Sequence, residues 1–248
     1  MRTHRLLAAL LALHAATDAA GARSAPEGEG WNLHVTPYLW APSVRGDLAI
    51  EGVGGDAGDE GGSALDYLTG AFMLSFEADR GDWSVLGDVI WAEFGLEGTL
   101  DGPLATPYEA ENDELVIGLG LARNLSRGET AQLDGVFGLR YFHVDLSIDP
   151  QGGSVLDLSA RADLLDPFVG LRGRVGGETG LFGLAYGDVG GFGISSDLTW
   201  QAIVGAGWAW SWGDVRLGWR EIAYDFDSGG ILYDLSAGGP FLGLTFGF

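Results

Sequence analysis

The sequence predicts an all-β protein: a transmembrane, antiparallel, up-and-down β-barrel of about ten strands, with eight strands as the alternative. Three observations predict this fold. Long segments alternate between apolar residues and small or polar residues, the second set is rich in glycine and charge, and the last residues alternate in the same way up to Phe248. In a barrel that crosses a membrane, the apolar face meets lipid and the polar face lines the interior.

The clearest alternation is LTWQAIVGAGWAWSW, residues 198–212. One face of this segment carries tryptophan, leucine, valine and alanine, and the other carries mostly glycine, serine, threonine and glutamine. A strand of a soluble β-sandwich usually has about 5–6 residues, so this run is long enough to cross a membrane instead. Residues 72–79, 83–91, 114–122 and 215–219 follow the same pattern.

Turn signals divide the chain into short and long connections, which is the arrangement of outer-membrane barrels. Short connections are expected at 80–82, 124–129, 176–180 and 212–214, and long loops at 51–66, 100–113, 149–160, 192–197 and 226–232. The strands between them are expected at 31–50, 70–80, 83–99, 114–123, 130–148, 159–175, 181–192, 198–211, 214–226 and 231–248. With ten strands, both termini of the barrel domain then lie on the side of the short turns, which is the periplasmic side.

The first predicted strand is the least regular, because Pro37 and Pro42 must lie at bulges or unpaired positions. Eight strands result if 181–192 and 231–248 pair in another way.

Charged residues on the glycine-rich faces predict a hydrogen-bonded charge network in a narrow lumen. The face of Asp188 is ambiguous, since Phe182 and Tyr186 share its parity. The network is interpreted first as a structural polar core and second as the wall of a narrow pore. Its expected members are Glu77, Asp79, Asp88, Asp134, Arg140, Arg172, Arg174, Asp188, Arg216 and Arg220.

Tryptophan spacing predicts aromatic girdles at the two edges of a membrane. Trp83 and Trp91 are eight positions apart on one face, as are Trp200 and Trp208. In a strand tilted near 40°, eight residues rise about 20 Å, close to the height of the apolar band of such barrels. The expected girdle consists of Trp83, Trp91, Trp200, Trp208, Trp210 and Trp219.

The C-terminal segment predicts a closing strand and an assembly signal. Leu242, Leu244, Phe246 and Phe248 are expected to face lipid, and Phe241 to point inward over space left by glycines such as Gly243. Pairing of this strand with the first one would remove the free edges of the sheet.

The N-terminal residues predict export. Residues 1–22 have the form of a signal peptide, with Arg2 and Arg5 before the apolar run 6–16 and small residues at 20–22. A short periplasmic segment, 23–30, and a barrel domain, 31–248, are expected to follow. The alternative interpretation of the first residues is a buried helix.

Composition limits the partners. The net charge is −22 and all 13 basic residues are arginine, so nucleic acid is excluded as an expected partner. The chain has no cysteine, which rules out disulfides and thiolate chemistry. The long segments near 51–66, 108–114 and 224–234 are acidic, and they are interpreted as a solvated surface rather than a metal site.

Several segments resemble known outer-membrane proteins. The C-terminal phenylalanine resembles the last strand that the barrel-assembly machinery reads, and PFVGLRG and PFLGLTF resemble strands of small outer-membrane barrels of the opacity-like class. TPYLW, FEADRGDWSVLGDVIW, GDVGGFG, SDLTWQA and GPFLGLTFGF together are similar to a family of uncharacterised proteobacterial outer-membrane proteins. The resemblance implies the Gram-negative outer membrane as location, with its lipid, its lipopolysaccharide and the assembly machinery as partners of a monomer. It implies no activity.

The expected role is structural, adhesive or narrow-pore (porin-like), without a cofactor and without catalytic residues. Past the signal segment the only histidines are His34 and His143, and neither belongs to a clear nucleophile–base set; Ser147 and Asp145 are only distant candidates beside His143. Two alternatives stay open: a barrel enzyme acting on lipid or peptide, and a soluble periplasmic β-barrel that binds an apolar ligand.

Overall fold

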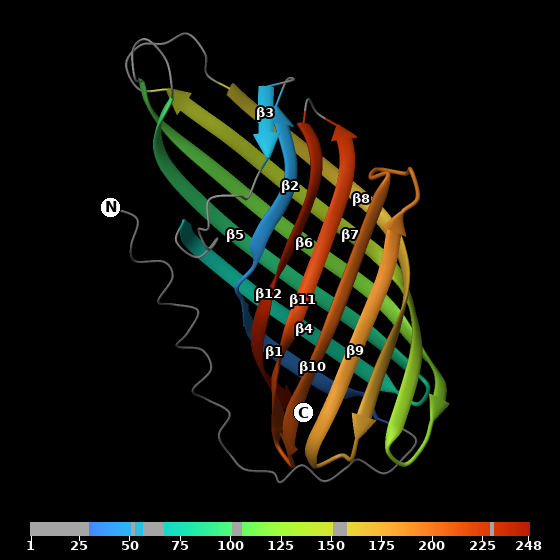
Figure 1. Ribbon diagram of the computed structural model, residues 1–248. Coiled ribbons are helices and arrows are strands. Elements are labelled where there is room, and N and C mark those ends of the chain that lie inside the picture. The colour runs from blue at the N-terminus through green and yellow to red at the C-terminus, as the bar shows by residue number, and fades with distance from the viewer. Residues whose placement is uncertain (1–29, 51–52, 57–66, 101–105, 151–157, 229–230) are drawn as a thin grey trace.

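All the regular structure that is described in this chain is β-strand (Figure 1). The computed structural model describes residues 30–50, 53–56, 67–100, 106–150, 158–228 and 231–248, so the predicted signal peptide lies outside the described residues. The strands are β1 (Asn32–Trp40), β2 (Ser43–Ile50), β3 (Val53–Asp56), β4 (Leu68–Arg80), β5 (Trp83–Leu100), β6 (Thr106–Arg127), β7 (Ala131–Pro150), β8 (Leu158–Gly176), β9 (Gly180–Gly191), β10 (Leu198–Trp210), β11 (Gly213–Ser228) and β12 (Ile231–Gly247). No helix in these ranges is long and apolar enough to cross a bilayer.

The strands form one antiparallel sheet that closes on itself, because β1 pairs with β4 on one side and with β12 on the other. Strands β1 and β2 are two parts of the first wall strand, and β3 is an extra strand attached to β2. The result is a ten-stranded barrel with one additional strand, which confirms the predicted fold class and the larger strand count. The C-terminus and the short turns lie at the same end, the lower end in Figure 1.

Proline accounts for the irregular first strand. The ladder between β1 and β12 passes from Val35↔Phe246 to Tyr38↔Gly243, so it omits Pro37, which has no N–H to donate. Ala41 and Pro42 separate β1 from β2. Above this break β2 stays paired with β12, but it no longer pairs with β4.

Several predicted boundaries are wrong. The expected long loop at 51–66 contains β3, strand β6 already begins at Thr106 within the expected loop 100–113, and it continues to Arg127 through the expected turn 124–129. Only residues 229–230 separate β11 from β12, where a longer loop was expected. The hydrogen-bonded ladders between neighbouring strands continue beyond the apolar segments, because pairing of backbone groups does not require apolar side chains.

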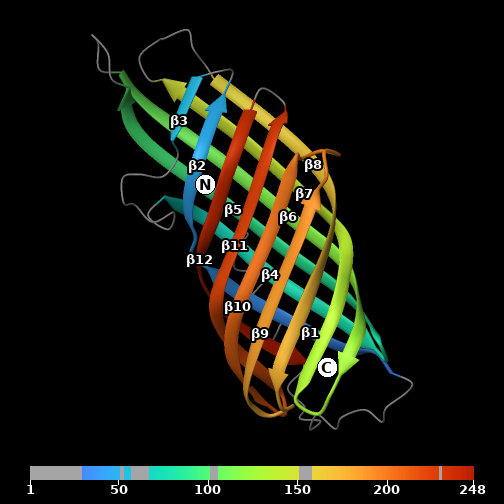
Figure 2. The same cartoon turned by 45° about the vertical axis from the view of Figure 1, so that its right-hand side comes forward.

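The walls differ in height. Strand β6 has 22 residues and β9 has 12, so the wall formed by β5 to β8 extends beyond the wall formed by β9 and β10 at the end away from the short turns. At that end β2, β12 and β11 form a layer that crosses in front of β6 to β8 (Figures 1 and 2). Strands β2 and β12 also approach β8 across the interior, so the barrel is flattened there.

Side chains alternate between the two faces of the wall. Outward positions carry exposed leucine, valine, phenylalanine and tryptophan around the barrel, and inward positions are buried. Leu242 and Leu244 belong to this apolar belt, Phe246 is half-buried against Trp212, and Phe248 is 79% exposed at the short-turn end.

Phe241 points inward as expected, over the space left by a glycine. It lies opposite Gly218 on β11, where an added Cβ would come within 2.7 Å of its ring. The neighbours of Gly243 are Thr36 and Tyr38 instead. The ring lies over Gly218 and not over Gly243 because a side chain in a strand packs on the neighbouring strand, not along its own.

Candidate functional site: the barrel interior

The inward-facing side chains form two tiers, which follow one another along the same strands. The ion-pair tier occupies the middle and the short-turn end, and it contains Glu77, Asp88, Asp134, Arg140, Arg172, Asp188 and Arg220. The aromatic tier occupies the opposite, extracellular end, and it contains Phe142, Tyr224, Phe226 and Tyr233 with the aliphatic residues packed on them.

Arg220 of β11 joins four strands in the middle of the lumen. Its Nη2 lies 2.6 Å from Asp88 Oδ2 on β5 and donates to Gln201 Oε1 on β10 at 2.7 Å. Its Nη1 donates to the Tyr38 hydroxyl on β1 at 2.7 Å, and that hydroxyl donates to Asp88 Oδ1 at 2.9 Å. Arg220 is only 4% exposed, and its cluster crosses the lumen from β11 to β5 and β1.

A second buried arginine, Arg140 of β7, pairs with Asp188 of β9 at 2.6 Å. The Tyr186 hydroxyl donates to the same carboxylate oxygen at 2.6 Å, and Arg140 also donates to Thr199 Oγ1 at 3.3 Å. The ambiguous face of β9 is thereby settled: Phe182, Tyr186 and Asp188 all point inward.

Arg172 of β8 forms the ion pairs nearest the short-turn end of this tier. Its guanidinium lies 2.8 Å from Glu77 on β4 and 2.9 Å from Asp134 on β7. Asn124 and Gln132 donate further hydrogen bonds to Asp134, at 2.8 and 3.0 Å. The carboxylate is therefore almost fully hydrogen-bonded, as a buried charge requires.

Three predicted network residues lie apart from these clusters. Asp79 pairs with His34 at 3.3 Å, and Arg216 pairs with its near neighbour Asp214 at 2.6 Å. Arg174 has no ion pair among the described contacts; its guanidinium lies 3.5 Å from the centre of the Phe182 ring, a cation–π arrangement.

The aromatic tier occupies the extracellular half of the lumen. The Phe142 and Tyr224 rings stack with centres 4.4 Å apart, Phe226 and Tyr233 stack at 5.0 Å, and Phe142 meets Tyr233 edge-on at 5.6 Å. Leu164, Val144, Ile222 and Leu235 pack around these rings. The flattening of the barrel brings the β11–β12 layer close to β7 and β8, so their inward side chains pack against one another.

Asp166 of β8 holds the loop between β9 and β10, the strands of the lower wall. Its carboxylate, 1% exposed, accepts hydrogen bonds from the backbone N–H groups of Ser195 and Ser196 at 3.0 and 2.9 Å, and from the Ser196 hydroxyl at 2.6 Å. The loop between β9 and β10 is thus fixed over the edge of the barrel.

The predicted girdle tryptophans lie on outward positions. Trp83, Trp208, Trp210 and Trp219 are exposed on the outer face. Trp91 and Trp200 are half-buried among their neighbours. The Trp219 indole N–H donates to Glu221 at 3.2 Å, near the upper edge of the apolar belt, which suits a residue with one apolar and one polar end.

A polar cluster lies on the outer face of the tall wall, above the apolar belt. Asp163 accepts a hydrogen bond from the Tyr141 hydroxyl at 2.5 Å, and His143 Nδ1 lies 2.8 Å from the same oxygen. These two contacts hold the pKa of Asp163 below its ordinary value. Arg161 Nε lies 3.6 Å from the other carboxylate oxygen. Across the described ranges, no group of three or more histidines and acids is placed to hold a metal ion.

Sequence reasoning did not find the aromatic tier or the polar partners of the arginines. A signal was present, because Tyr224 and Phe226 have the same parity as Arg220 and therefore point inward with it. The expectation of a polar lumen along its whole height hid this signal.

No family model matches the chain, and no curated protein matches it. Among solved structures, the chain is similar to Ail, the attachment invasion locus protein of Yersinia pestis, in complex with the heparin analogue sucrose octasulfate. The identity is 14%, the alignment covers 89% of this chain and 99% of that chain, and the TM-score is 0.40. The translocator domain of the autotransporter NalP from Neisseria meningitidis gives 13% identity, 89% coverage of both chains and a TM-score of 0.49. The toluene transporter TodX of P. putida gives 13% identity, 90% coverage of both chains and a TM-score of 0.25.

At these scores the likeness is weak, and the fold assignment rests on the closed hydrogen-bonded ladders of the chain itself. A closed antiparallel barrel with an apolar outer belt is the form in which β-proteins span the bacterial outer membrane, and this chain is an outer-membrane barrel of that kind. The finer resemblance to opacity-like proteins stays a prediction.

Proposed function

We propose that the protein is a non-catalytic outer-membrane barrel with a closed interior, which acts through its extracellular surface by adhesive contact. The observation that supports a closed interior is the presence of two consecutive tiers in the lumen. Arg220 and Arg140 are held across the middle by carboxylates on other strands, and stacked aromatic rings fill the extracellular half. An ion on this path would have to displace both.

The charge of the extracellular end supports an adhesive role with a cationic partner surface. Acidic side chains outnumber arginines among the described residues of that end. The exposed acids are Glu111, Asp113, Asp163, Asp197, Asp225, Asp227 and Asp234, and the exposed arginines are Arg45 and Arg161. A field of one sign attracts a surface of the opposite sign within about one Debye length, ~8 Å at physiological ionic strength.

Planar-bilayer recording tests the closed interior. The purified wild-type barrel should give no stepwise conductance, and Phe142→Ala/Phe226→Ala should stay silent because the ion-pair tier still crosses the lumen. Adding Asp88→Ala/Arg220→Ala and Arg140→Ala/Asp188→Ala, which removes the buried ion pairs as well, should give small steps. Folding of each variant is checked by heat-modifiable migration on a gel. Ohmic steps in the wild type that Arg220→Glu changes would contradict the proposal and support the narrow-pore alternative.

Surface binding tests the adhesive role. Cells that display the wild-type protein should bind polylysine-coated beads better than neutral beads, and this preference should fall severalfold for Asp225→Asn/Asp227→Asn/Asp234→Asn. Equal binding of both displayed proteins at low salt would contradict an electrostatic adhesive surface. The predicted contacts with lipopolysaccharide and with the assembly machinery, and the monomeric state, remain proposals.

A further inference from the structure

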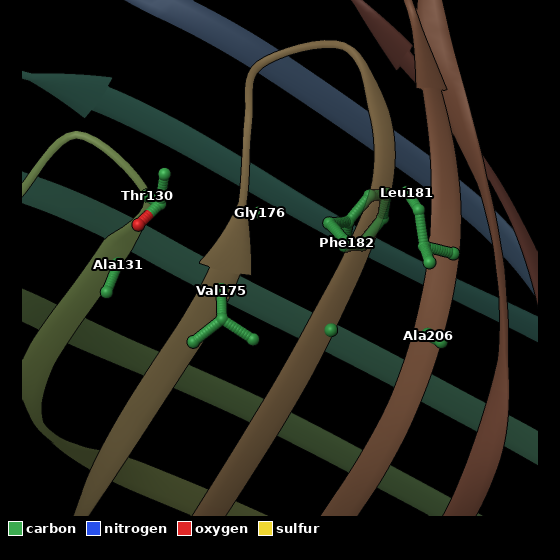
Figure 3. A pocket seen from close by; sticks show the side chains of 8 residues that line it. Thr130, Ala131, Val175, Gly176, Leu181, Phe182 and Ala206 are labelled. Atoms are coloured by element: carbon green, nitrogen blue, oxygen red, sulfur yellow. The ribbon is translucent and has the colours of Figure 1, made fainter.

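The outer face of the barrel has a depression in the apolar belt, close to the short-turn end. It has a volume of about 500 Å³ and lies over the ends of β7 to β10 (Figure 3). Val175 and Leu181 border it, Gly183 and Ala206 form its floor, and Thr130 stands at its periplasmic rim. It is separate from the two tiers of the interior.

Small side chains on adjacent strands produce this depression. Outward positions on β9 are glycine or alanine for three consecutive alternations, and most of their cross-strand partners on β10 are also small. The pairs are Gly183↔Ala206, Ala185↔Val204 and Gly187↔Ala202. Larger exposed residues flank this strip of small side chains, with Val175 and Leu171 on β8 and Leu217 on β11, and the depression lies at its short-turn end, which we call the groove.

A groove at this depth has to be filled by hydrocarbon. An empty space would forgo the dispersion contacts of every atom that lines it, and water would find few polar partners on an apolar wall. The groove opens in the half of the belt next to the short periplasmic turns, so the nearest hydrocarbon is an acyl chain of the periplasmic leaflet.

The rim of the groove carries negative charge. Glu129 lies next to Thr130 in the turn before β7, and Glu178 lies in the turn between β8 and β9; both are exposed. The two turns are tied together by a hydrogen bond from Gly176 N to Thr130 O of 2.8 Å. Arg127, the last residue of β6 before the turn that contains Glu129, donates to Gly81 O and so points away from the groove to the turn between β4 and β5.

We infer that this groove binds one phospholipid with an amine headgroup, such as phosphatidylethanolamine. An acyl chain lies over Gly183 and Ala206, and the ammonium group lies beside Glu129 and Glu178. A lipid with a net negative headgroup meets the same two carboxylates without a compensating ammonium and binds more weakly. The inference requires that the barrel spans the membrane, and it is independent of whether the lumen conducts.

Native mass spectrometry tests the inference. The wild-type barrel is reconstituted in vesicles of equal parts phosphatidylethanolamine and phosphatidylglycerol with the same acyl chains, then transferred gently to detergent. One retained lipid per barrel is expected, with phosphatidylethanolamine favoured about fivefold. Ala206→Leu fills the groove and should lose the retained lipid, while Ala78→Leu, an outward position of β4 in the same half of the belt, should keep it.

The headgroup is tested separately by Glu129→Gln/Glu178→Gln, which lies in exposed turns and does not depend on packing of the barrel wall. This variant should keep a lipid but bind both headgroups equally. Retention of phosphatidylethanolamine by Ala206→Leu, an unchanged preference in the double glutamine variant, or a wild-type dimer that excludes lipid from the groove would each overturn the inference.

Discussion

The two halves of the interior are built on the same alternating positions of the same strands, yet one half is ionic and the other is aromatic. On β7, Arg140 and Phe142 are consecutive inward residues, and on β11 the same is true of Arg220 and Ile222, with Tyr224 next. The difference follows the shape of the barrel. Where the lumen is wide, long arginines span it to carboxylates on other walls; where it is flattened, the layers are close enough for rings to stack.

Inward side chains can thus pack the lumen as ion pairs or as aromatic rings, and the stability of the barrel should depend differently on each. A buried ion pair contributes little net stability over an apolar core, but losing one partner leaves an isolated buried charge. An aromatic cluster loses only contacts and cavity volume when a ring is trimmed. The two halves should therefore respond differently to substitution.

The largest effect is expected for Asp188→Ala. This variant leaves the buried guanidinium of Arg140 without its carboxylate, and the free energy of unfolding should fall by about 3–5 kcal/mol. Urea unfolding in lipid vesicles measures it. The double variant Arg140→Met/Asp188→Leu removes both charges and should recover most of the loss; a double variant as unstable as the single one would contradict the account.

A smaller effect is expected for Phe142→Leu in the aromatic tier. The change keeps the site apolar but removes the stacking on Tyr224 and leaves a cavity, so the loss should be about 1–3 kcal/mol. The matched control is Phe137→Leu, an outward position of the same strand, which faces lipid and should change stability by much less. Equal losses in both variants would mean that the tier is not a packed core.

A still smaller effect is expected for Arg216→Gln. Arg216 pairs with Asp214 near the short turns, where the Arg216 side chain is 27% exposed but that of Asp214 only 11%, so solvent screens the pair only in part; the loss should be about 1 kcal/mol and should shrink at high salt. Unfolding at low and high salt measures it. A loss as large as that of Asp188→Ala would show that depth in the lumen does not govern the strength of these pairs.

The smallest effect concerns Asp163 on the outer face. Hydrogen bonds from Tyr141 and then His143 lower its pKa, so the stabilisation from these contacts is present above the ordinary aspartate pKa of about 4 and is lost as the pH falls through the lowered value. Carboxyl NMR titration should therefore give a pKa below that of an ordinary aspartate. Tyr141→Phe should raise the pKa more than His143→Gln, and an unchanged pKa in both variants would rule out this cause.

Much of the fold was predictable from the sequence. Alternation over segments such as 198–212 predicts strands that cross a membrane, and the parity of each residue predicts its face. Pro37 and Pro42 predict an irregular first strand. Strand ends were predicted less well, because the ladders of β6 extend into polar segments whose side chains do not alternate.

The partners within the interior could not be predicted. Parity places Asp88 and Arg220 on the inner face, but they are 132 positions apart, and only the closed barrel with its register brings them to 2.6 Å. The same holds for Tyr38 and Gln201, which complete that cluster.

A membrane-spanning barrel, and the side of the wall that each residue faces, can be predicted from the sequence because both follow from a local period of two. The folded barrel sets which inward residues meet, where the wall flattens, and how Phe142, Tyr224, Phe226 and Tyr233 stack in one half of the lumen. Those outcomes depend on strand register and on the distance between opposite walls, and neither quantity is contained in the pattern of any single strand.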